Sequence, residues 1–312
     1  MLYFINNNKR FILVATDGVH GSNYIQSDAR CGGNIFQQVA QGRIVNGVEA
    51  KPNTWPWLVV MLESGDLRCG GTIISEQYIL TAAHCCTDVK YHLDVNTISF
   101  VAGEHDLTEE SVFEQRVNAQ ELFVHPKYDQ NTGDYNFCVV KTDLIELDGV
   151  SRDIVCLPLQ NEHIKPNDDI PMALSDTNCH VAGWGVLSSG GSHPDVLQTT
   201  SVKIFSDEYC VKTSLYKEYM KPHVVSLGTG VSFCAGYDDG SQDSCQGDSG
   251  GPLICVVDGA PVLYGVVSYG YGCADSDYPG IYAKVASQID WLSTVIGENN
   301  FVYCICNIIS SV

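Results

Sequence analysis

The sequence predicts an all-β fold built from many short strands. Of its 312 residues, 45% are hydrophobic and only 17% are charged, and 29 glycines and 11 prolines are spread along the chain. Frequent Gly and Pro interrupt regular elements at short intervals, which favours strands joined by turns over long helices. The length is sufficient for one large domain or two medium ones with a sizeable core.

Charge and cysteine content narrow the class of protein. The formal net charge is −20 and the chain has only 17 Lys and Arg residues, so we expect no nucleic-acid partner, because phosphate binding requires clustered cations. The 14 cysteines show no paired C-x-x-C metal pattern, which favours disulfides and secretion to the extracellular space. Neither apolar patch of "MLYFINNNKRFILVATDG" (1–18) forms a typical signal segment, and no apolar run is long enough to predict a membrane span.

Three stretches carry candidate chemistry. "RIVNG" (43–47) contains a bond, Arg43–Ile44, that an Arg-directed protease would cut, leaving an ammonium on Ile44. "YILTAAHCC" (78–86) is a strand-like run that ends in small residues and His84; a lone histidine of this kind is more often a packed or solvated side chain than a base. "DSCQGDSGGPLIC" (243–255) places Ser249 between glycines, which suits either an exposed nucleophile with converging backbone N–H groups or a plain turn.

In this order, and together with "CGG" (69–71), "VAGWG" (181–185) and "VVSYGYGCA" (266–274), these stretches resemble the chymotrypsin/trypsin family of serine endopeptidases. The resemblance covers about residues 31–297. It implies two packed six-stranded antiparallel Greek-key barrels, with the site in the cleft between them and a short C-terminal helix. The expected divisions are a leader and activation peptide (1–43), a peptidase domain (44–297) with barrels at about 44–160 and 161–285, and an apolar tail without an assigned role (298–312).

The resemblance also implies the catalytic roles. Ser249 would be the nucleophile, and His84 the general base that takes its proton and later protonates the leaving amine. The backbone N–H groups of Gly247 and Ser249 would form the oxyanion hole. After cleavage, the new ammonium of Ile44 would pair with Asp248, so the precursor would be a nearly inactive zymogen.

Substrate preference follows from the same resemblance. Asp243 stands at the base of the primary specificity pocket, where a carboxylate selects Arg or Lys. Gly270 and Gly280 match the glycines of the pocket walls, and Ser268 and Tyr269 begin the strand along which a substrate backbone would pair. Tyr269 stands where a Trp is usual. The expected partners are protein or peptide substrates with Arg or Lys, an activating protease and protein inhibitors.

The cysteines fit the family pattern of disulfides. A further bridge would keep the cleaved propeptide attached, and we infer that Cys86 bridges to Cys138, free buried thiols being the alternative. Cys304 and Cys306 have no assigned partner. The expected pairs are Cys69–Cys85, Cys179–Cys255, Cys210–Cys234, Cys245–Cys273, Cys31–Cys156 and Cys86–Cys138.

The third member of the triad departs from the family. "NFCVVK" (136–141) fits the frame of the family motif with Asn136 in the Asp position. Asp134 would lie about 6.6 Å away along a strand, too far to replace it without local rearrangement. An amide that donates to the histidine blocks the base, and this change lowers turnover in the family by roughly 10⁴-fold. A weakened protease, a silent homologue that binds peptides, a triad completed by Asp134 and an erroneous codon at position 136 are the open explanations.

An acidic stretch is a candidate metal site. "GEHDLTEESVFEQ" (103–115) resembles the calcium loop of trypsins, with Glu104 and Glu114 as carboxylate ligands and Ser111 in place of a third. A solvated acidic loop is an equally good interpretation. No cofactor is required for the expected chemistry, so calcium would stabilise the loop without taking part in the reaction.

Overall fold

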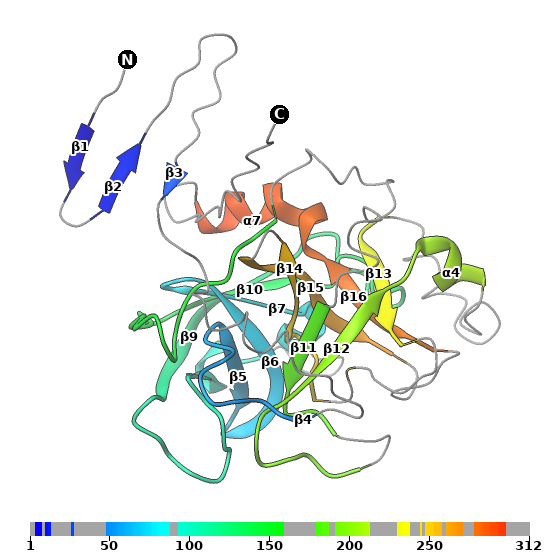
Figure 1. The fold of residues 1–312 in the computed structure, drawn as a ribbon, viewed down its shortest axis with the longest axis horizontal. Helices are drawn as coiled ribbons and strands as arrows, with labels where there is room; N and C mark the ends of the chain where they lie inside the picture. The colour runs from blue at the N-terminus through cyan, green and yellow to red at the C-terminus, as the bar shows by residue number, and fades with distance from the viewer. Residues whose placement is uncertain are drawn as a thin grey trace.

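The computed structural model describes residues 4–7, 10–13, 26–27, 48–87, 93–158, 179–186, 191–212, 230–237, 244, 247–257, 260–270 and 278–297. Two closed six-stranded antiparallel barrels and a short C-terminal helix make up the body of the molecule (Figure 1). The all-β architecture and the C-terminal helix expected from the sequence are therefore confirmed.

The first barrel closes in the strand order β10-β7-β6-β5-β8-β9. Apolar and β-branched residues dominate β5, β7 and β8, whereas β9 alternates buried and exposed residues over its first half. In β5 every residue but Glu63 is buried, and the core includes Trp57, Phe100 and Ile73. The strands are β5 (Leu58–Glu63), β6 (Asp66–Ser75), β7 (Tyr78–Thr81), β8 (Ile98–Ala102), β9 (Gln115–Val124) and β10 (Cys138–Thr142).

The second barrel follows the order β11-β14-β15-β16-β13-β12, and the pairing of β11 with β12 closes it; β4 (Val48–Glu49) adds to β12 at the edge. The rings of Phe233 and Tyr282 stack in its core with centroids 5.6 Å apart. The strands are β11 (Cys179–Gly183), β12 (Gln198–Ile204), β13 (Ser232–Gly236), β14 (Pro252–Val257), β15 (Ala260–Tyr269) and β16 (Gly280–Lys284).

Helices are short in the described part of the chain. The expected C-terminal helix begins as a 3₁₀ turn, η2 (Val285–Gln288), and continues as α7 (Ile289–Ile296), which buries Ile289, Leu292 and Ile296 along one face. It ends at Gly297, whose φ of 81° favours glycine. The other helices are α2 (Ala83–Cys86), η1 (Val95–Thr97) and α4 (Asp207–Lys212).

The expected leader contains three strands that the sequence did not predict. They are β1 (Phe4–Asn7), β2 (Arg10–Leu13) and β3 (Gln26–Ser27), and they form an antiparallel sheet of their own. β1 and β2 correspond to the two apolar patches separated by a polar stretch.

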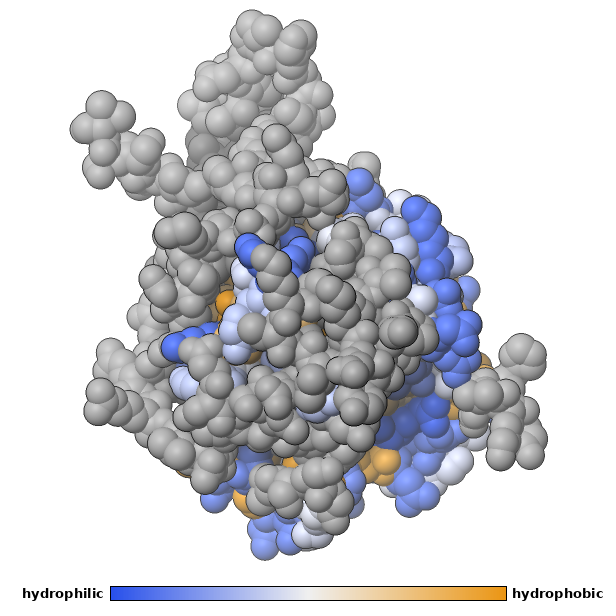
Figure 2. All heavy atoms as spheres, turned by 90° about the vertical axis from the view of Figure 1, so that its right-hand side faces the viewer, coloured by the Kyte–Doolittle hydropathy of each residue, from blue (hydrophilic) through white to orange (hydrophobic). Residues whose placement is uncertain are grey.

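Polar residues cover most of the described surface on one face of the molecule. On the face shown in Figure 2, the described residues are mostly hydrophilic, and hydrophobic residues are visible only in small scattered groups. Among the described residues, no helix is both long and apolar enough to cross a bilayer.

Candidate active site

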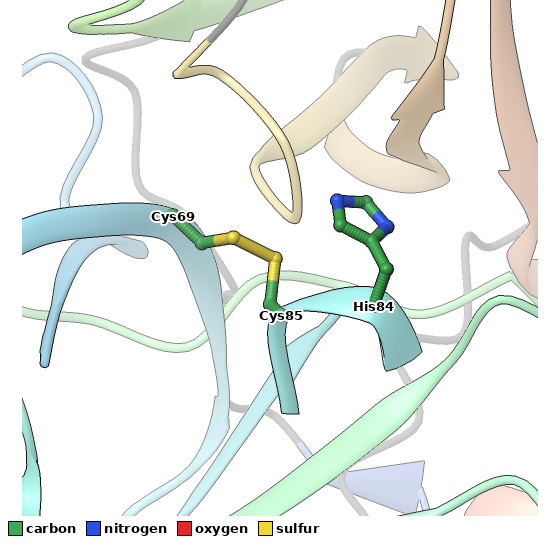
Figure 3. A group of neighbouring side chains, drawn as sticks. All are labelled: Cys69, His84 and Cys85. Atoms are coloured by element: carbon green, nitrogen blue, oxygen red, sulfur yellow. A yellow bond between two sulfur atoms is a disulfide. The ribbon is translucent and has the colours of Figure 1, made fainter. Parts of the chain in front are cut away.

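His84 lies on α2, immediately after β7 of the first barrel. The small residues Ala82 and Ala83 are completely buried, which lets the chain turn from the strand into the helix against the barrel wall. The next two residues, Cys85 and Cys86, both form disulfides, to β6 and β10 respectively. Figure 3 shows the His84 ring projecting from α2 beside the Cys69–Cys85 bridge. The helix that carries His84 is thus tied covalently to two strands.

Cys69, His84 and Cys85 come close enough to suggest a metal site, because their ligand atoms lie within 4.8 Å of one another. The two sulfur atoms, however, are bonded to each other (Figure 3). A thiolate, and not a disulfide sulfur, is the metal ligand. Cys69 and Cys85 are therefore a structural disulfide, not metal ligands.

Asn136 precedes β10 and contacts His84 through both ends of its amide. Its Oδ1 accepts a hydrogen bond from the backbone N–H of His84 at 3.0 Å, a group in the first turn of α2 for which the helix itself offers no acceptor. Its Nδ2 lies 2.9 Å from His84 Nδ1 and donates to Ser268 Oγ at 2.7 Å. With 2% of its surface exposed, Asn136 is held between the two barrels.

These contacts determine which nitrogen of the His84 ring carries the proton. The backbone N–H of His84 can only donate, so the amide atom that faces it must be oxygen, and Nδ2 must face the ring. An amide N–H that points at Nδ1 requires a lone pair there. The neutral imidazole then carries its proton on Nε2, the nitrogen that a general base would need free.

The ring is also biased towards the neutral form. The pKa of His84 is lowered, chiefly because burial disfavours the charged imidazolium, and the positive charge of Arg68 lowers it further. The Asn136 oxygen, 3.3 Å from Nδ1, opposes this shift. Since the lowering dominates, burial favours the neutral form of the His84 ring.

Asp134 lies in the turn before Asn136. Its backbone N–H donates to Thr132 Oγ1 at 3.2 Å, and its carbonyl accepts from the N–H of Asp129 at 3.1 Å. Tyr135, which follows it, has a φ of 54°, a left-handed conformation that redirects the chain. The hydrogen bonds to His84 come from Asn136, the residue that the sequence frame placed in this position.

Ser249 lies in a tight turn that docks against the first barrel. Its carbonyl accepts from the N–H of Gly70 on β6 at 2.8 Å. Gly250 has a φ of 79°, and a Cβ there would lie 2.1 Å from Thr81 Oγ1, so only glycine fits. Because Thr81 is three residues before His84, this close approach brings the Ser249 turn to the segment that carries the histidine.

Asp248 is oriented away from that contact. Its Oδ1 accepts from the N–H of Gly185 at 2.7 Å, and a Cβ on Gly183 or Gly185 would lie 2.2 or 2.5 Å from the carboxylate. Gly183 ends β11 and Gly185 follows it, and the Asp248 carboxylate occupies the space of their missing side chains. Arg43 and Ile44 lie outside the described residues, so their roles in activation stay predictions.

The strands β15 and β16 place the expected substrate-binding residues next to each other. Ser268 and Tyr269 are the last two residues of β15, so the expectation that they begin a strand was wrong. Ser268 is buried, Gly270 is exposed directly after this strand, and Gly280 is buried at the start of β16. Tyr269 packs its ring against Gly133, where a Cβ would meet the ring at 2.4 Å. Asp243 lies outside the described residues, and its place in the pocket is a prediction.

The described residues contain four disulfides, all of them among the expected pairs. They include the pair inferred for Cys86, which joins α2 to β10. Cys156 is buried; its expected partner Cys31, the pair Cys245–Cys273, and the tail residues Cys304 and Cys306 lie outside the described residues. The four disulfides are Cys69–Cys85, Cys86–Cys138, Cys179–Cys255 and Cys210–Cys234.

The acidic stretch at 103–115 forms a loop whose ends meet. Gly103 has a φ of 77°, and a Cβ there would overlap the carbonyl oxygen of Phe113 at 2.0 Å. The closure brings two carboxylates together: the pKa of Glu104 is raised to about 7, first by burial and then by the negative charge of Glu114. Carboxylate oxygens are ligands that calcium prefers, so Glu104 and Glu114 are of the chemical type that the calcium prediction requires.

Sequence reasoning missed two features of the site. His193 is exposed, with Nδ1 2.8 Å from the carbonyl oxygen of Trp184, and its ring is so close to Gly247 that a Cβ there would lie 2.6 Å from Cε1. No local motif marks this residue. The bond from Asn136 to Ser268 joins positions 132 residues apart, and the sequence had linked Ser268 only to the substrate strand.

Comparison with known proteins agrees with this architecture. The family model described as Trypsin matches residues 44–292. The chain is 35% identical to trypsin of Xenopus laevis over 258 residues, covering 82% of this chain and 92% of that protein. It is 34% identical to trypsin of Sus scrofa over 258 residues, covering 82% of this chain and 97% of that protein. The chain therefore belongs to the trypsin family of serine endopeptidases.

Proposed function

We propose that this chain is a secreted, trypsin-like endopeptidase with a low intrinsic turnover. It is made as a zymogen, is activated by cleavage after Arg43, and hydrolyses peptide bonds after Arg or Lys. The disulfides of the described part are consistent with secretion, because they persist in oxidising compartments. Its partners are protein or peptide substrates, an activating protease and protein inhibitors. Calcium bound by Glu104 and Glu114 would stabilise the fold and take no part in the reaction.

In the proposed reaction, Ser249 Oγ attacks the carbonyl carbon of the scissile bond. Its proton passes to His84 Nε2, which later gives a proton to the leaving amine. The N–H groups of Gly247 and Ser249 stabilise the negative charge that develops on the carbonyl oxygen. Asp243 binds the Arg or Lys side chain that precedes the scissile bond.

The proposal of a low turnover rests on one observation, the contact of 2.9 Å between Asn136 Nδ2 and His84 Nδ1. It favours the tautomer in which Nε2 already carries a proton and cannot accept one from Ser249. The active tautomer must be reached at the expense of this bond. A loss of roughly 10⁴-fold corresponds to about 5.5 kcal/mol of transition-state stabilisation.

The same contact favours a second candidate function. If the tautomer that accepts the serine proton is never reached, the cleft binds peptides without cleaving them. The Ser249 turn, the Asp248 contacts and the strands of the substrate site would then serve recognition alone. The two candidate functions differ in the rate of peptide hydrolysis, because only the protease uses His84 as a base.

Substitution Asn136→Asp tests the proposal. The carboxylate would accept Nδ1–H of His84 and release Nε2 to act as the base, so we expect kcat/KM to rise by about 10³- to 10⁴-fold. The measurement is hydrolysis of an Arg-containing amide substrate by parent and variant, each cleaved after Arg43.

Asp134→Asn is the matched control. It removes a neighbouring carboxylate from the same turn and should leave the rate of the parent unchanged, whereas a loss of activity would show that Asp134 completes the triad. An Asn136→Asp variant as slow as the parent would overturn the proposed enzyme and leave the binding function.

A further inference from the structure

We propose that a surface beside the first barrel binds an amphipathic, cationic segment of a partner protein. Two segments of the chain, 111–115 and 143–152, form this surface, and none of their residues takes part in the proposed reaction. Its centre is an apolar patch of four exposed side chains. The patch consists of Val112, Phe113, Leu144 and Val150, whose exposed fractions are 92%, 45%, 55% and 48%.

Exposed apolar side chains gather in these two segments. Among the described residues, large hydrophobic side chains are exposed at six positions, and four of the six belong to the patch. Leu144 is exposed although Ile145, the next residue, is buried in the core. Single exposed hydrophobic residues are common on protein surfaces, whereas a cluster of them with a polar rim is typical of an interaction surface.

Hydrogen bonds hold the two segments side by side. Gln115 Nε2 donates to the carbonyl of Leu144 at 2.9 Å, and its Oε1 accepts from the N–H of Glu146 at 2.8 Å. From the other segment, the guanidinium of Arg152 donates to the carbonyl of Phe113. The backbones that carry the apolar patch are therefore joined at both ends of the contact.

The turn that carries Val150 is fixed in the same way. Asp148 Oδ1 accepts from the N–H groups of Val150, Ser151 and Arg152 at 2.8, 2.7 and 3.0 Å. Ser151 Oγ lies 3.4 Å from the carbonyl oxygen of Phe113, so this turn reaches the other segment. A surface that is already ordered loses little conformational entropy when a partner binds.

Carboxylates surround the apolar patch. Within two residues of its members, the chain carries five acidic side chains and one basic side chain, Arg152. Only 12% of the Arg152 side chain is exposed, because its guanidinium pairs with Asp148 and donates to backbone carbonyls. The rim of the patch is therefore negative. Its five acidic residues are Glu110, Glu114, Asp143, Glu146 and Asp148.

The next cations along the chain are directed at other groups. Arg116 donates to Ser99 Oγ on β8 at 3.4 Å, and Lys141 on β10 stands opposite Glu121 in the pairing with β9.

An apolar centre with a negative rim defines the chemistry of the partner. A segment with apolar side chains on one face and Lys or Arg beside them would cover the patch and pair with the rim. A second copy of this chain would bring the same carboxylates against the rim, and like charges repel. The charge of the surface therefore favours a cationic partner over self-association.

The test is a titration of fluorescently labelled peptides, followed by anisotropy at an ionic strength of about 0.15 M. The protein is the uncleaved full chain with Ser249→Ala, so that the proposed protease activity does not consume the probe. The probe is an amphipathic peptide of Leu and Lys. One control peptide has Ser in place of every Leu, and the other has Glu in place of every Lys. We expect the Leu/Lys peptide to bind at least about tenfold more tightly than either control.

Two matched pairs of substitutions locate the binding site. Val112→Ser with Leu144→Ser should abolish the preference for the Leu/Lys peptide. Val48→Ser with Leu107→Ser, which removes two exposed apolar side chains outside the patch, should preserve it. Glu110→Gln with Glu146→Gln should weaken the binding of the Leu/Lys peptide and make it less sensitive to salt.

Three results would overturn the inference. Equal affinity for the Leu/Lys and Ser/Lys peptides would mean that net charge alone attracts the probe. Unchanged binding after Val112→Ser with Leu144→Ser would place the probe elsewhere on the protein. Sedimentation equilibrium supplies the third: self-association of the chain that this pair of substitutions abolishes would make a second copy the occupant. None of these measurements depends on hydrolysis, so their outcome is independent of the proposed protease function.

Discussion

Ser268 holds the amide of Asn136 in place, because its Oγ accepts a hydrogen bond from Asn136 Nδ2 at 2.7 Å. Removing its hydroxyl with Ser268→Ala leaves one buried amide N–H of Asn136 without its acceptor. We expect the free energy of unfolding to fall by about 1–3 kcal/mol, the range for a buried polar group that loses its partner. Urea denaturation followed by circular dichroism measures it.

The control for this change is Thr294→Ala on α7. It also removes one hydroxyl with one hydrogen bond, to the carbonyl of Asp290, but at an exposed position. Its effect should stay within about 0.5 kcal/mol. Equal effects of the two substitutions would mean that Ser268 does not support the amide.

The sequence was sufficient to predict that Asn136 stands beside His84, but not how the Asn136 amide is oriented. The stretch "NFCVVK" placed Asn136 next to His84, because it fits the frame of the family motif with Asn136 in the Asp position, and a frame that begins at Asp134 would move the apolar residues out of step. The tautomer depends on two further contacts, one to the backbone of His84 and one to Ser268 in the other barrel. Neither contact leaves a local pattern in the sequence.

At the scale of elements, the loop 103–115 carries the clearest link between charge and stability. Glu104 has a pKa of about 7 against an ordinary value of 4.5, so the folded loop holds this proton more tightly than the unfolded chain does. The stabilisation from protonation is complete below about pH 4.5 and is lost as the pH rises through about 7. Calcium between Glu104 and Glu114 would then take the place of the proton.

We therefore expect calcium to raise Tm, and to raise it more at about pH 8 than at about pH 5. Differential scanning calorimetry with calcium and with a chelator measures both differences. Glu104→Gln should abolish the calcium effect and stabilise the calcium-free protein at the higher pH. Glu109→Gln, on the exposed side of the same loop, should preserve the effect. A calcium effect that survives Glu104→Gln would leave the stretch as a solvated acidic loop.

A disulfide between two elements also fixes the position of His84 relative to Asn136. The Cys86–Cys138 bridge joins α2 to β10, so it connects the helix of His84 to the strand that begins two residues after Asn136. We inferred this pair because Cys86 follows Cys85 directly and because the fold implied by the family resemblance brings the histidine turn against the start of the strand that carries Cys138. The contact between His84 and Asn136 is thereby held by a covalent link as well as by hydrogen bonds.

For the whole molecule, the sequence predicted the two barrels through several motifs that agree in order. Each motif lies next to one end of a strand: His84 follows β7, Asn136 precedes β10 and Ser249 precedes β14. The small sheet of β1–β3 was not predicted, because short apolar patches in a leader carry no periodic signal that distinguishes strands from other structure.

We expect activation to involve the whole chain, because cleavage after Arg43 would separate the leader and create an ammonium on Ile44 that pairs with Asp248, just before β14 of the second barrel. Before cleavage this ammonium does not exist, so the ion pair cannot form. We expect the precursor to bind a fluorescent benzamidine at least about tenfold more weakly than the form cleaved after Arg43, since one charge-assisted contact of this kind changes affinity by that amount.

Two variants separate cleavage from its consequence. Arg43→Gln should resist the activating protease and stay in the weakly binding state. Asp248→Asn should be cut at the same bond, as N-terminal sequencing from Ile44 would show, yet gain little affinity because the ammonium has no carboxylate to meet. If Asp248→Asn tightened on cleavage as much as the parent, the ion pair would not be what orders the pocket, and activation would have to act through the removal of the leader alone.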